Sequence, residues 1–232
     1  MRNFVIINGV NSNTINGLGI NELPPITKPE MRNIREEIDG RDGDITTNLG
    51  YSAYDKTITI GLFGTGYDIN DIVAFFNGEG TIVFSNEQDK YYNFKILNQI
   101  DYESLQKFRT ASITFHCQPF KWSVVRFEEV FTSQFDIFNY GNIYSKPIYE
   151  LTGTGTVNLS INNTQVLVIV FGDSSKTITI DTETLDAYDT NGLVNRSITG
   201  DYKNLFLNVG KSEFTWSGTI TQVKIKKASR WL

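Results

Sequence analysis

Alternation of apolar and polar residues runs through most of this chain and restricts it to folds built from β-strands. Successive side chains of a strand point to opposite faces, so a strand with one buried face shows a period of two. β-Branched and aromatic residues, which favour strands, occupy many of the apolar positions. The alternating segments are KTITIGLF, GTIVFSN, YYNFKILNQI, RTASITFHCQPF, TVNLSINN, KTITID and TQVKIKK. We therefore expect a mainly β protein.

One segment, DINDIVAFFNGEG, has a helical period instead. Asp68 is placed to cap the amino end of this helix, and Gly78 is placed to close its carboxyl end. The apolar positions on one helix face are Ile69, Ile72, Val73 and Phe76. The first part of the chain is therefore predicted to be a sheet domain that carries one packed helix.

The pattern of alternating segments and turn signals changes near residues 131–145. Beyond this region, the turn signals GTG, INN, GDSSK, DTNG and VGKSE separate short alternating segments. Turns every ~8 to 12 residues between strands are typical of a β-sandwich. We predict two β-domains, residues 1–133 and 134–232, with the boundary near Gln134. The two halves show no clear internal repeat, which favours two different domains over a duplication.

Charge and cysteine content exclude several classes of function. Lys and Arg total 21 and Asp and Glu total 26, so the net charge of −5 gives no global attraction to nucleic acid or to acidic membranes. The single Cys117 excludes an internal disulfide and a cysteine-based zinc site. No apolar stretch approaches the ~18 residues that span a bilayer, and no signal peptide is recognisable. We expect no cofactor and no membrane partner.

The stretch IDGRDGDITTNLGYSAYD concentrates charged residues among glycines and is the segment most similar to a site. A calcium loop places oxygen ligands at alternate positions and a bidentate Glu at the twelfth. From Asp39, the third position is Arg41, a repelling cation, and the twelfth is Gly50. From Asp42, the twelfth position is Ala53. Neither register fits, and the segment is better interpreted as a connection that leads into a strand, with glycines that allow positive φ.

No catalytic arrangement emerges from the sequence. The only histidine, His116, is adjacent to Cys117, and neighbours on a strand point to opposite faces, so they cannot form a nucleophile and base pair. We expect Cys117 to be a buried, inert thiol. The adjacent glutamates at 36–37 and 128–129 do not face each other across a substrate and are expected to form solvated charged faces.

The carboxyl-terminal segment QVKIKKASRWL is basic and alternating. Such a strand can contact acidic neighbours or nucleic acid. The simpler interpretation is that its lysines protect an exposed sheet edge. Without a catalytic constellation, the chain is expected to bind or to assemble.

Several segments, in their shared order and spacing, resemble the distal tail proteins of siphophages that infect Gram-positive bacteria, including prophage copies. The resemblance runs nearly end to end. Its pieces are INGV, LPPITKPE, IDGRDGDITTNLGYSAYDKTI, FFNGEGTIVFSNEQDKYYNFKI, ITFHCQPFKW, FNYGNIYSKPIYELTGTGTVNLSIN, TITIDTETLDAYD and GDYKNLFLNVGKSEFTWSGTITQVKIKKASRWL.

The resemblance implies a tail-tube-like amino-terminal domain, a β-sandwich or split barrel, and a carboxyl-terminal sandwich like a galectin or carbohydrate-binding module. It implies a non-enzymatic protein of the virion tail tip, assembled in the bacterial host cytoplasm. Six copies would form a ring between the tail-tube protein above and the tail-associated protein below, with DNA passing through the channel without specific binding. In several relatives, the outer domain holds receptor-binding proteins.

Two sets of residues are candidates for recognition. We expect Arg41, Asp42 and Asp44 to lie at a subunit interface, although Arg41 can equally pair with carboxylates of its own chain. The alternative function is adhesion, in which the carboxyl-terminal domain binds host cell-wall glycans. Trp216 is the candidate for that role, and a buried sandwich tryptophan is the competing interpretation.

Overall fold

The computed structural model describes residues 2–125, 127–227 and 229–232. The chain divides into two compact units. Unit 1 covers the described residues up to Val124, and unit 2 covers those from Val125 to Trp231. This division lies before the boundary that we expected near Gln134, because the strands on both sides of Gln134 pair within unit 2. Among the described residues, no helix has both the length and the apolar character needed to cross a membrane.

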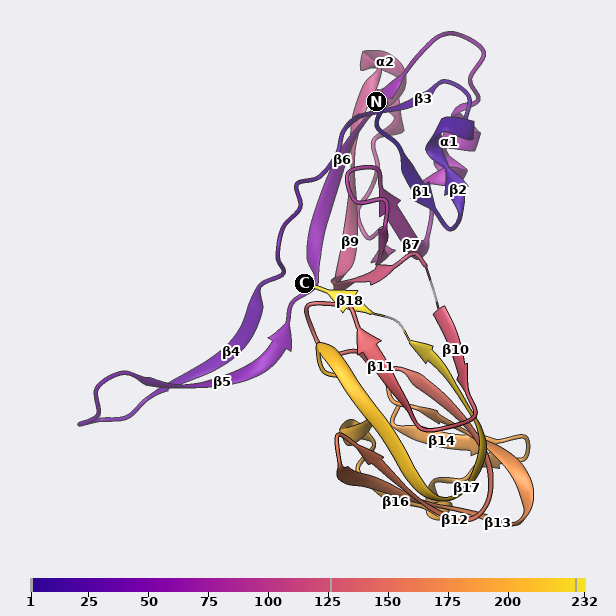
Figure 1. Cartoon of the computed structure of the whole chain (residues 1–232). Helices are drawn as coiled ribbons and strands as arrows, with labels where there is room; N and C mark the ends of the chain where they lie inside the picture. The colour runs from indigo at the N-terminus through magenta and orange to yellow at the C-terminus, as the bar shows by residue number, and fades with distance from the viewer. Residues whose placement is uncertain (1, 126, 228) are drawn as a thin grey trace. The chain divides into compact units, whose positions relative to one another are not determined.

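Strands are the main elements of unit 1, which also has two short α-helices (Figure 1). Its elements are β1 (Val5–Ile7), β2 (Val10–Asn11), η1 (Ser12–Thr14), β3 (Leu18–Glu22), β4 (Met31–Glu37), β5 (Asp44–Tyr51), β6 (Tyr54–Leu62), α1 (Ile69–Phe75), β7 (Glu79–Phe84), β8 (Lys90–Lys95), α2 (Tyr102–Phe108) and β9 (Thr110–Ser123).

The main sheet of unit 1 follows the order β2-β1-β7-β8-β9-β6-β3, with antiparallel neighbours. Phe115 on β9 is fully buried at the centre of the core. Its ring centroid lies 6.1 Å from that of Phe84 and 5.2 Å from that of Phe94, both in edge-to-face geometry. Such pairs add to the burial of apolar area, so these rings join β7, β8 and β9 into one core.

Helix α1 forms where the helical period predicted it. The Asp68 side chain accepts a hydrogen bond from the backbone N–H of Asn70 at 2.8 Å, as expected of an amino-terminal cap. Ile72 and Phe76 are buried as expected, and Gly78 follows the helix with φ of 81°. Val73, which we placed on the apolar face, is 38% exposed, and Phe75 is buried instead.

Helix α2 was not predicted, so the expectation of a single helix is wrong in this respect. The segment read as one strand through Ile100 ends as β8 at Lys95, and α2 follows after a loop. Asp101 caps α2 through the N–H of Ser104 at 2.9 Å, but Leu105 is its only fully buried residue. A helix of seven residues with one buried position has no measurable apolar period.

Unit 2 is also built from strands, several of them long. Its elements are β10 (Phe127–Phe131), β11 (Phe135–Asn139), β12 (Ile148–Ile161), β13 (Thr164–Asp181), β14 (Asp186–Asp189), β15 (Gly192–Leu193), η2 (Asn195–Ser197), β16 (Ile198–Gly200), η3 (Tyr202–Leu205), β17 (Gly210–Lys227) and β18 (Arg230–Trp231).

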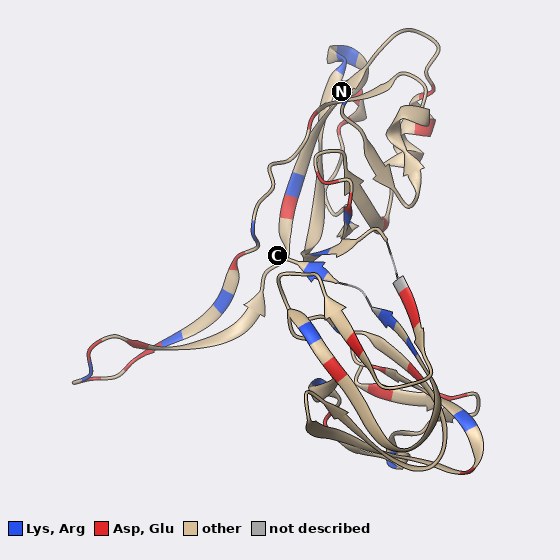
Figure 2. Ribbon diagram, viewed as in Figure 1, with Lys and Arg blue, Asp and Glu red and all other residues tan. Residues whose placement is uncertain are grey.

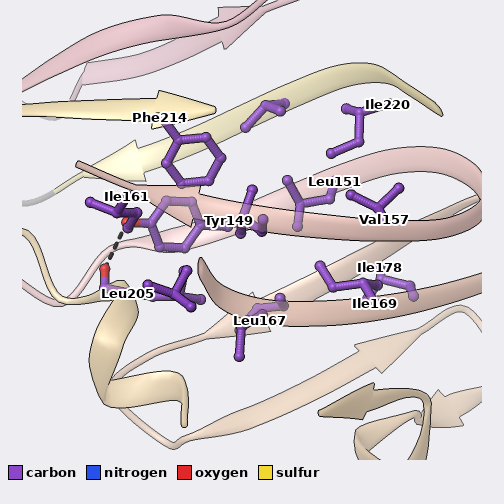
Figure 3. Packing of buried hydrophobic residues seen from close by; sticks show 14 of the residues in the cluster. Tyr149, Leu151, Val157, Ile161, Leu167, Ile169, Ile178, Leu205, Phe214 and Ile220 are labelled. Carbon is purple, nitrogen blue, oxygen red and sulfur yellow. Dashed lines mark hydrogen bonds between the residues drawn. The ribbon is translucent and has the colours of Figure 1, made fainter. Parts of the chain in front are cut away.

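The strands of unit 2 follow the order β10-β17-β12-β13-β14-β15, while β11 pairs with β17 and β16 pairs with β13. Register shifts near Gly153 and Gly155 interrupt the ladder of β12 with β13. Buried side chains of β12, β13 and β17 fill the space between them (Figure 3). The hydroxyl of Tyr149 donates to the carbonyl oxygen of Leu205 at 2.7 Å within this core. The predicted mainly β fold is confirmed.

Candidate self-association surface

Strands β4 and β5 form a hairpin that pairs with no other strand among the described residues. It leaves the main sheet of unit 1 as a separate arm (Figure 1). The two strands run antiparallel from the pair Met31 and Tyr51 to the pair Glu37 and Asp44. Every residue from 31 to 50 is exposed. The segment that was read as a connection is therefore the tip and second strand of this hairpin.

Glycines shape the tip of the hairpin. Gly40 and Gly43 have φ values of 80° and 79°, a region that residues with a Cβ rarely adopt, and the N–H of Arg41 donates to the carbonyl oxygen of Ile38 at 3.1 Å. Arg41 and Asp42 lie between these glycines with exposed side chains. Within the described ranges, neither side chain takes part in a hydrogen bond or an ion pair. The charges of Arg41 and Asp42 therefore have no partner within the described part of the chain.

Asp44, the third candidate, begins β5. It accepts a hydrogen bond from the Thr46 hydroxyl at 2.9 Å and lies 3.9 Å from Nε of Arg35 on β4. This ion pair is long and exposed, so it stabilises the hairpin little. The pairing of Arg41 with neighbouring carboxylates, one of our two interpretations, is absent among the described residues. The register places Glu37 opposite Asp44, and Arg35, opposite Thr46, reaches Asp44 diagonally across the two strands.

Apolar side chains are exposed along both strands of the hairpin. Each is at least 38% exposed: Met31, Ile34, Ile38, Ile45 and Leu49. Charged residues lie between them and continue around the tip (Figure 2). An isolated two-stranded hairpin is marginally stable in water, and exposed apolar residues that gather on one element indicate a contact surface. The surface offers both apolar area and unpaired charge to a partner.

The sheet of unit 1 accounts for the remaining residues that drew attention in the sequence. Cys117 is fully buried, whereas His116 on the opposite face bonds Asp55 through Nδ1 and Oδ1 at 2.8 Å. Burial raises the pKa of the Cys117 thiol to about 12. The predictions that the thiol is buried and that its neighbour points to the other face are confirmed, and its inertness stays a prediction. Among the described residues, no group of three or more His, Cys, Asp or Glu is placed to hold a metal ion.

Trp216 lies on β17, half-buried against the core of unit 2. Its ring centroid is 6.4 Å from those of Phe135 and Phe214. Phe135 is stacked at 3.7 Å on Phe131 and at 4.9 Å on Phe214, and two near-parallel rings this close must occupy its two opposite faces. Neither face of Phe135 is therefore open to a sugar ring.

A shallow hollow of about 190 Å³ lies beside this aromatic stack, and Gln134, Phe135, Asp136, Glu213 and Thr215 line it. Asp136 already pairs with Lys211 at 2.8 Å. Polar groups are present, but the aromatic surface on which sugars usually stack is turned into the core.

The basic carboxyl-terminal strand does not protect an edge, contrary to the simpler interpretation of its lysines. It is part of β17, which lies between β10 and β12. Lys224 pairs with Glu128 at 2.9 Å and with Glu150 at 3.5 Å, and Lys226 also bonds Glu150. Cross-strand pairs of opposite charge stabilise adjacent strands. Lys224 and Lys226 therefore help to stabilise the pairing of β17 with its neighbouring strands.

Comparison with known proteins finds similar chains among solved structures. A scan against protein-family models finds no match, and a search of curated proteins finds none either. Among solved structures, the Dit protein of phage SPP1 aligns over 100% of both chains with a TM-score of 0.74 and 14% identity. The chain has the fold of a phage distal tail protein. That Dit protein is described as a paradigm of the hub adsorption apparatus in phages that infect Gram-positive bacteria.

The likeness to other phage structures is weaker. A chain of the phage p2 baseplate, in its activated conformation with Sr, aligns over 98% of this chain and 97% of that chain, with a TM-score of 0.49 and 11% identity. The corresponding chain in the Ca form gives 0.48 and 10% over 98% of both chains. At 14% identity, the SPP1 Dit likeness establishes the fold, and the role of this chain is argued separately.

The sequence predicted a connection in the stretch from Ile38 to Asp55, but neither the hairpin nor its exposed apolar residues. Met31, Ile34 and Ile38 recur at intervals of three and four, which does not indicate a strand. The hairpin itself could have been found from Gly40 and Gly43 on either side of Arg41, since closely spaced glycines are typical of a hairpin connection.

Proposed function

We propose that this protein is a structural distal tail protein of a long, non-contractile phage tail. Six copies would form a ring at the tail tip that joins the tail tube to the tail-tip or baseplate proteins and lets DNA pass. The full-length likeness to the SPP1 Dit hub carries the proposal. The same likeness supports a non-enzymatic role.

Hairpin β4–β5 is the proposed joint between neighbouring copies. In a closed ring, identical chains meet through two different complementary faces, so each copy must present a surface that its own fold leaves uncovered. The hairpin meets that requirement, because Ile34 and Ile45 supply apolar area and Arg41 and Asp42 supply free charges. Asp44 contributes at the edge of this surface.

Light scattering and negative-stain microscopy of the full-length protein test the ring. Arg41→Ala and Asp42→Ala should weaken assembly while the thermal midpoint stays unchanged, because neither side chain bonds within the described chain. Thr199→Ala, an exposed substitution on β16 of unit 2, is the matched control. If the wild-type chain stays monomeric and also fails to bind the next tail-tip protein, the proposal fails.

We also propose that DNA passes the ring without adhering to it. The net charge of −5 supports this, since every contact of a phosphate with a cation strengthens binding through counterion release. Fluorescence anisotropy with duplex DNA should show no binding at physiological salt. Binding whose affinity falls steeply with salt would contradict the proposal.

Glycan adhesion through unit 2 is the alternative and has less support, since Trp216 packs on the core aromatic rings. Cell-wall polysaccharide binding by the full chain, abolished by Trp216→Ala without loss of stability, would favour it. We expect instead that Trp216→Ala lowers the unfolding free energy of unit 2.

A further inference from the structure

Lys56 on β6 is a buried cation without a carboxylate partner. It is 3% exposed and takes part in no ion pair within the described part of the chain. Its Nζ donates to the carbonyl oxygen of Pro25 at 3.0 Å. It also lies 4.9 Å and 5.2 Å from the ring centroids of Tyr92 and Tyr54. A carbonyl oxygen and two aromatic rings therefore contact the buried ammonium.

The surroundings of Lys56 do not neutralise it locally. Lys121, also buried, pairs with Glu87 at 2.9 Å, and Glu87 accepts a further bond from the Tyr92 hydroxyl at 2.6 Å. The cluster thus contains two ammonium groups and one carboxylate, and that carboxylate pairs with Lys121. Desolvation lowers the pKa of Lys56 from its ordinary value. Burying such a charge costs folding free energy. The contact that Lys56 makes in return is its hydrogen bond to the Pro25 carbonyl oxygen.

The ammonium holds the chain that leads into hairpin β4–β5. The segment 23–30 runs from β3 to β4 outside any sheet. Pro24 and Pro25 lack an N–H, so only their carbonyl oxygens can anchor this part of the backbone. Asn86 donates to the Pro24 oxygen at 3.0 Å and Lys56 to the Pro25 oxygen. These two side chains therefore hydrogen-bond the first leg of the hairpin, in which Pro24 and Pro29 are also buried.

The second leg has a separate, apolar anchor. Tyr51 at the end of β5 packs edge-on against Phe120 of β9, with centroids 5.8 Å apart. Between the anchors, the N–H of Ser52 donates to the Glu30 oxygen at 2.8 Å and closes the base. Releasing the Lys56 bond would leave the hairpin intact but remove the anchor of the first leg at Pro25, while the Asn86 bond to Pro24 and the Ser52 bond to Glu30 remain.

We propose that Lys56 is a positioning residue for the contact between copies: by holding the Pro25 carbonyl, its ammonium fixes the direction in which the hairpin leaves the sheet. The inference rests on the proposed function, since a fixed direction favours assembly only if the hairpin docks on a neighbour. A preordered hairpin loses less conformational freedom on docking, and this strengthens the contact.

Spin-label distances in the full-length chain test the proposal. Thr47→Cys on the hairpin and Ser112→Cys on β9 are exposed sites, and the buried Cys117 does not compete for label. Doubly labelled protein is mixed with an excess of unlabelled protein so that only distances within one chain are read. Lys56→Met removes the charge and keeps the length of the side chain.

The control is Lys121→Met, which alters the same cluster without touching Pro25. We expect Lys56→Met to broaden the distance distribution and weaken self-association, with little loss of thermal stability. Lys121→Met should lower the thermal midpoint, because Glu87 stays buried without its cation, and leave the distribution narrow. An unchanged distribution in Lys56→Met, or equal broadening in both variants, overturns the proposal.

Assembly is measured separately, by light scattering of the unlabelled variants. A Lys56→Met hairpin that is broadened but assembles as the wild type also overturns the positioning role. If the wild-type protein neither self-associates nor binds the next tail-tip protein, the proposed function fails, while the distance comparison still decides whether Lys56 holds the hairpin.

Discussion

Replacing Ile34 and Ile45 with threonine should weaken the contact between copies and spare the fold. Ile34 is opposite Thr47 and Ile45 is opposite Glu36 in the hairpin register, so both isoleucines lie on one face. They are 50% and 38% exposed. Threonine keeps the β-branch that strands favour and removes apolar surface.

The size of the effect follows from the exposed fractions. Each Ile→Thr change removes roughly two apolar carbons, worth ~0.8 kcal/mol each when buried. Burying the exposed parts of the two side chains therefore contributes about 0.8 and about 0.6 kcal/mol, together ~1.4 kcal/mol per contact. That corresponds to about a tenfold weaker Kd. Folding stability should change by no more than about 0.5 kcal/mol, since both side chains are exposed.

Sedimentation velocity over a range of concentrations measures the association, and urea unfolding measures the stability. Leu193→Thr, at an exposed position of unit 2, serves as control and should leave association unchanged. If the double variant associates as tightly as the wild type while remaining folded, the hairpin face is not the joint and the reasoning is refuted.

Three further predictions concern the two cores and the charged face of unit 2. Tyr149→Phe should lower the unfolding free energy by about 1–3 kcal/mol in urea titrations, because the Leu205 carbonyl loses its buried donor. The bond from Lys226 holds the pKa of Glu150 below its ordinary 4.5, so the ionised carboxylate stabilises the fold above that pH, and the benefit disappears as pH falls below it; Glu150→Gln should flatten this acid limb of stability against pH. Cys117 should react with a maleimide at neutral pH only after unfolding, as mass spectrometry can show.

The strands of both cores were predictable because each has one buried face. Ile58 and Ile60 of β6, for example, are fully buried and alternate with polar residues, which is the period-two pattern in its simplest form. The same logic found α1, whose Ile72 is buried one turn from Phe76. Where an element buries a continuous face, the sequence carries its period.

Elements without a buried face escape this reasoning. Hairpin β4–β5 exposes both faces of residues 31–50, so no alternation marks it. Side-chain pairs between residues that are distant in the sequence cannot be predicted in this way either. Asp44 pairs with Arg35, which lies diagonally across the hairpin, and Lys224 pairs with two glutamates from the strands on either side of β17. Lys56 reads as an ordinary strand lysine, since nothing local indicates that its ammonium is buried beneath Pro25.

The charges of the stretch from Ile38 to Asp55 are neighbours in sequence but separate in use. Asp55 belongs to β6 and bonds His116 across the sheet, and Asp44 bonds Thr46 within the hairpin. Arg41 and Asp42 have no such bond among the described residues. Where a charged side chain makes no contact within its own fold, reversing its charge costs little stability. The reversal can still strongly weaken binding to a neighbouring copy. Charge reversal at Asp42 should therefore change assembly far more than charge reversal at Asp55. Equal effects at both positions would contradict the placement of Asp42, and not Asp55, at the contact between copies.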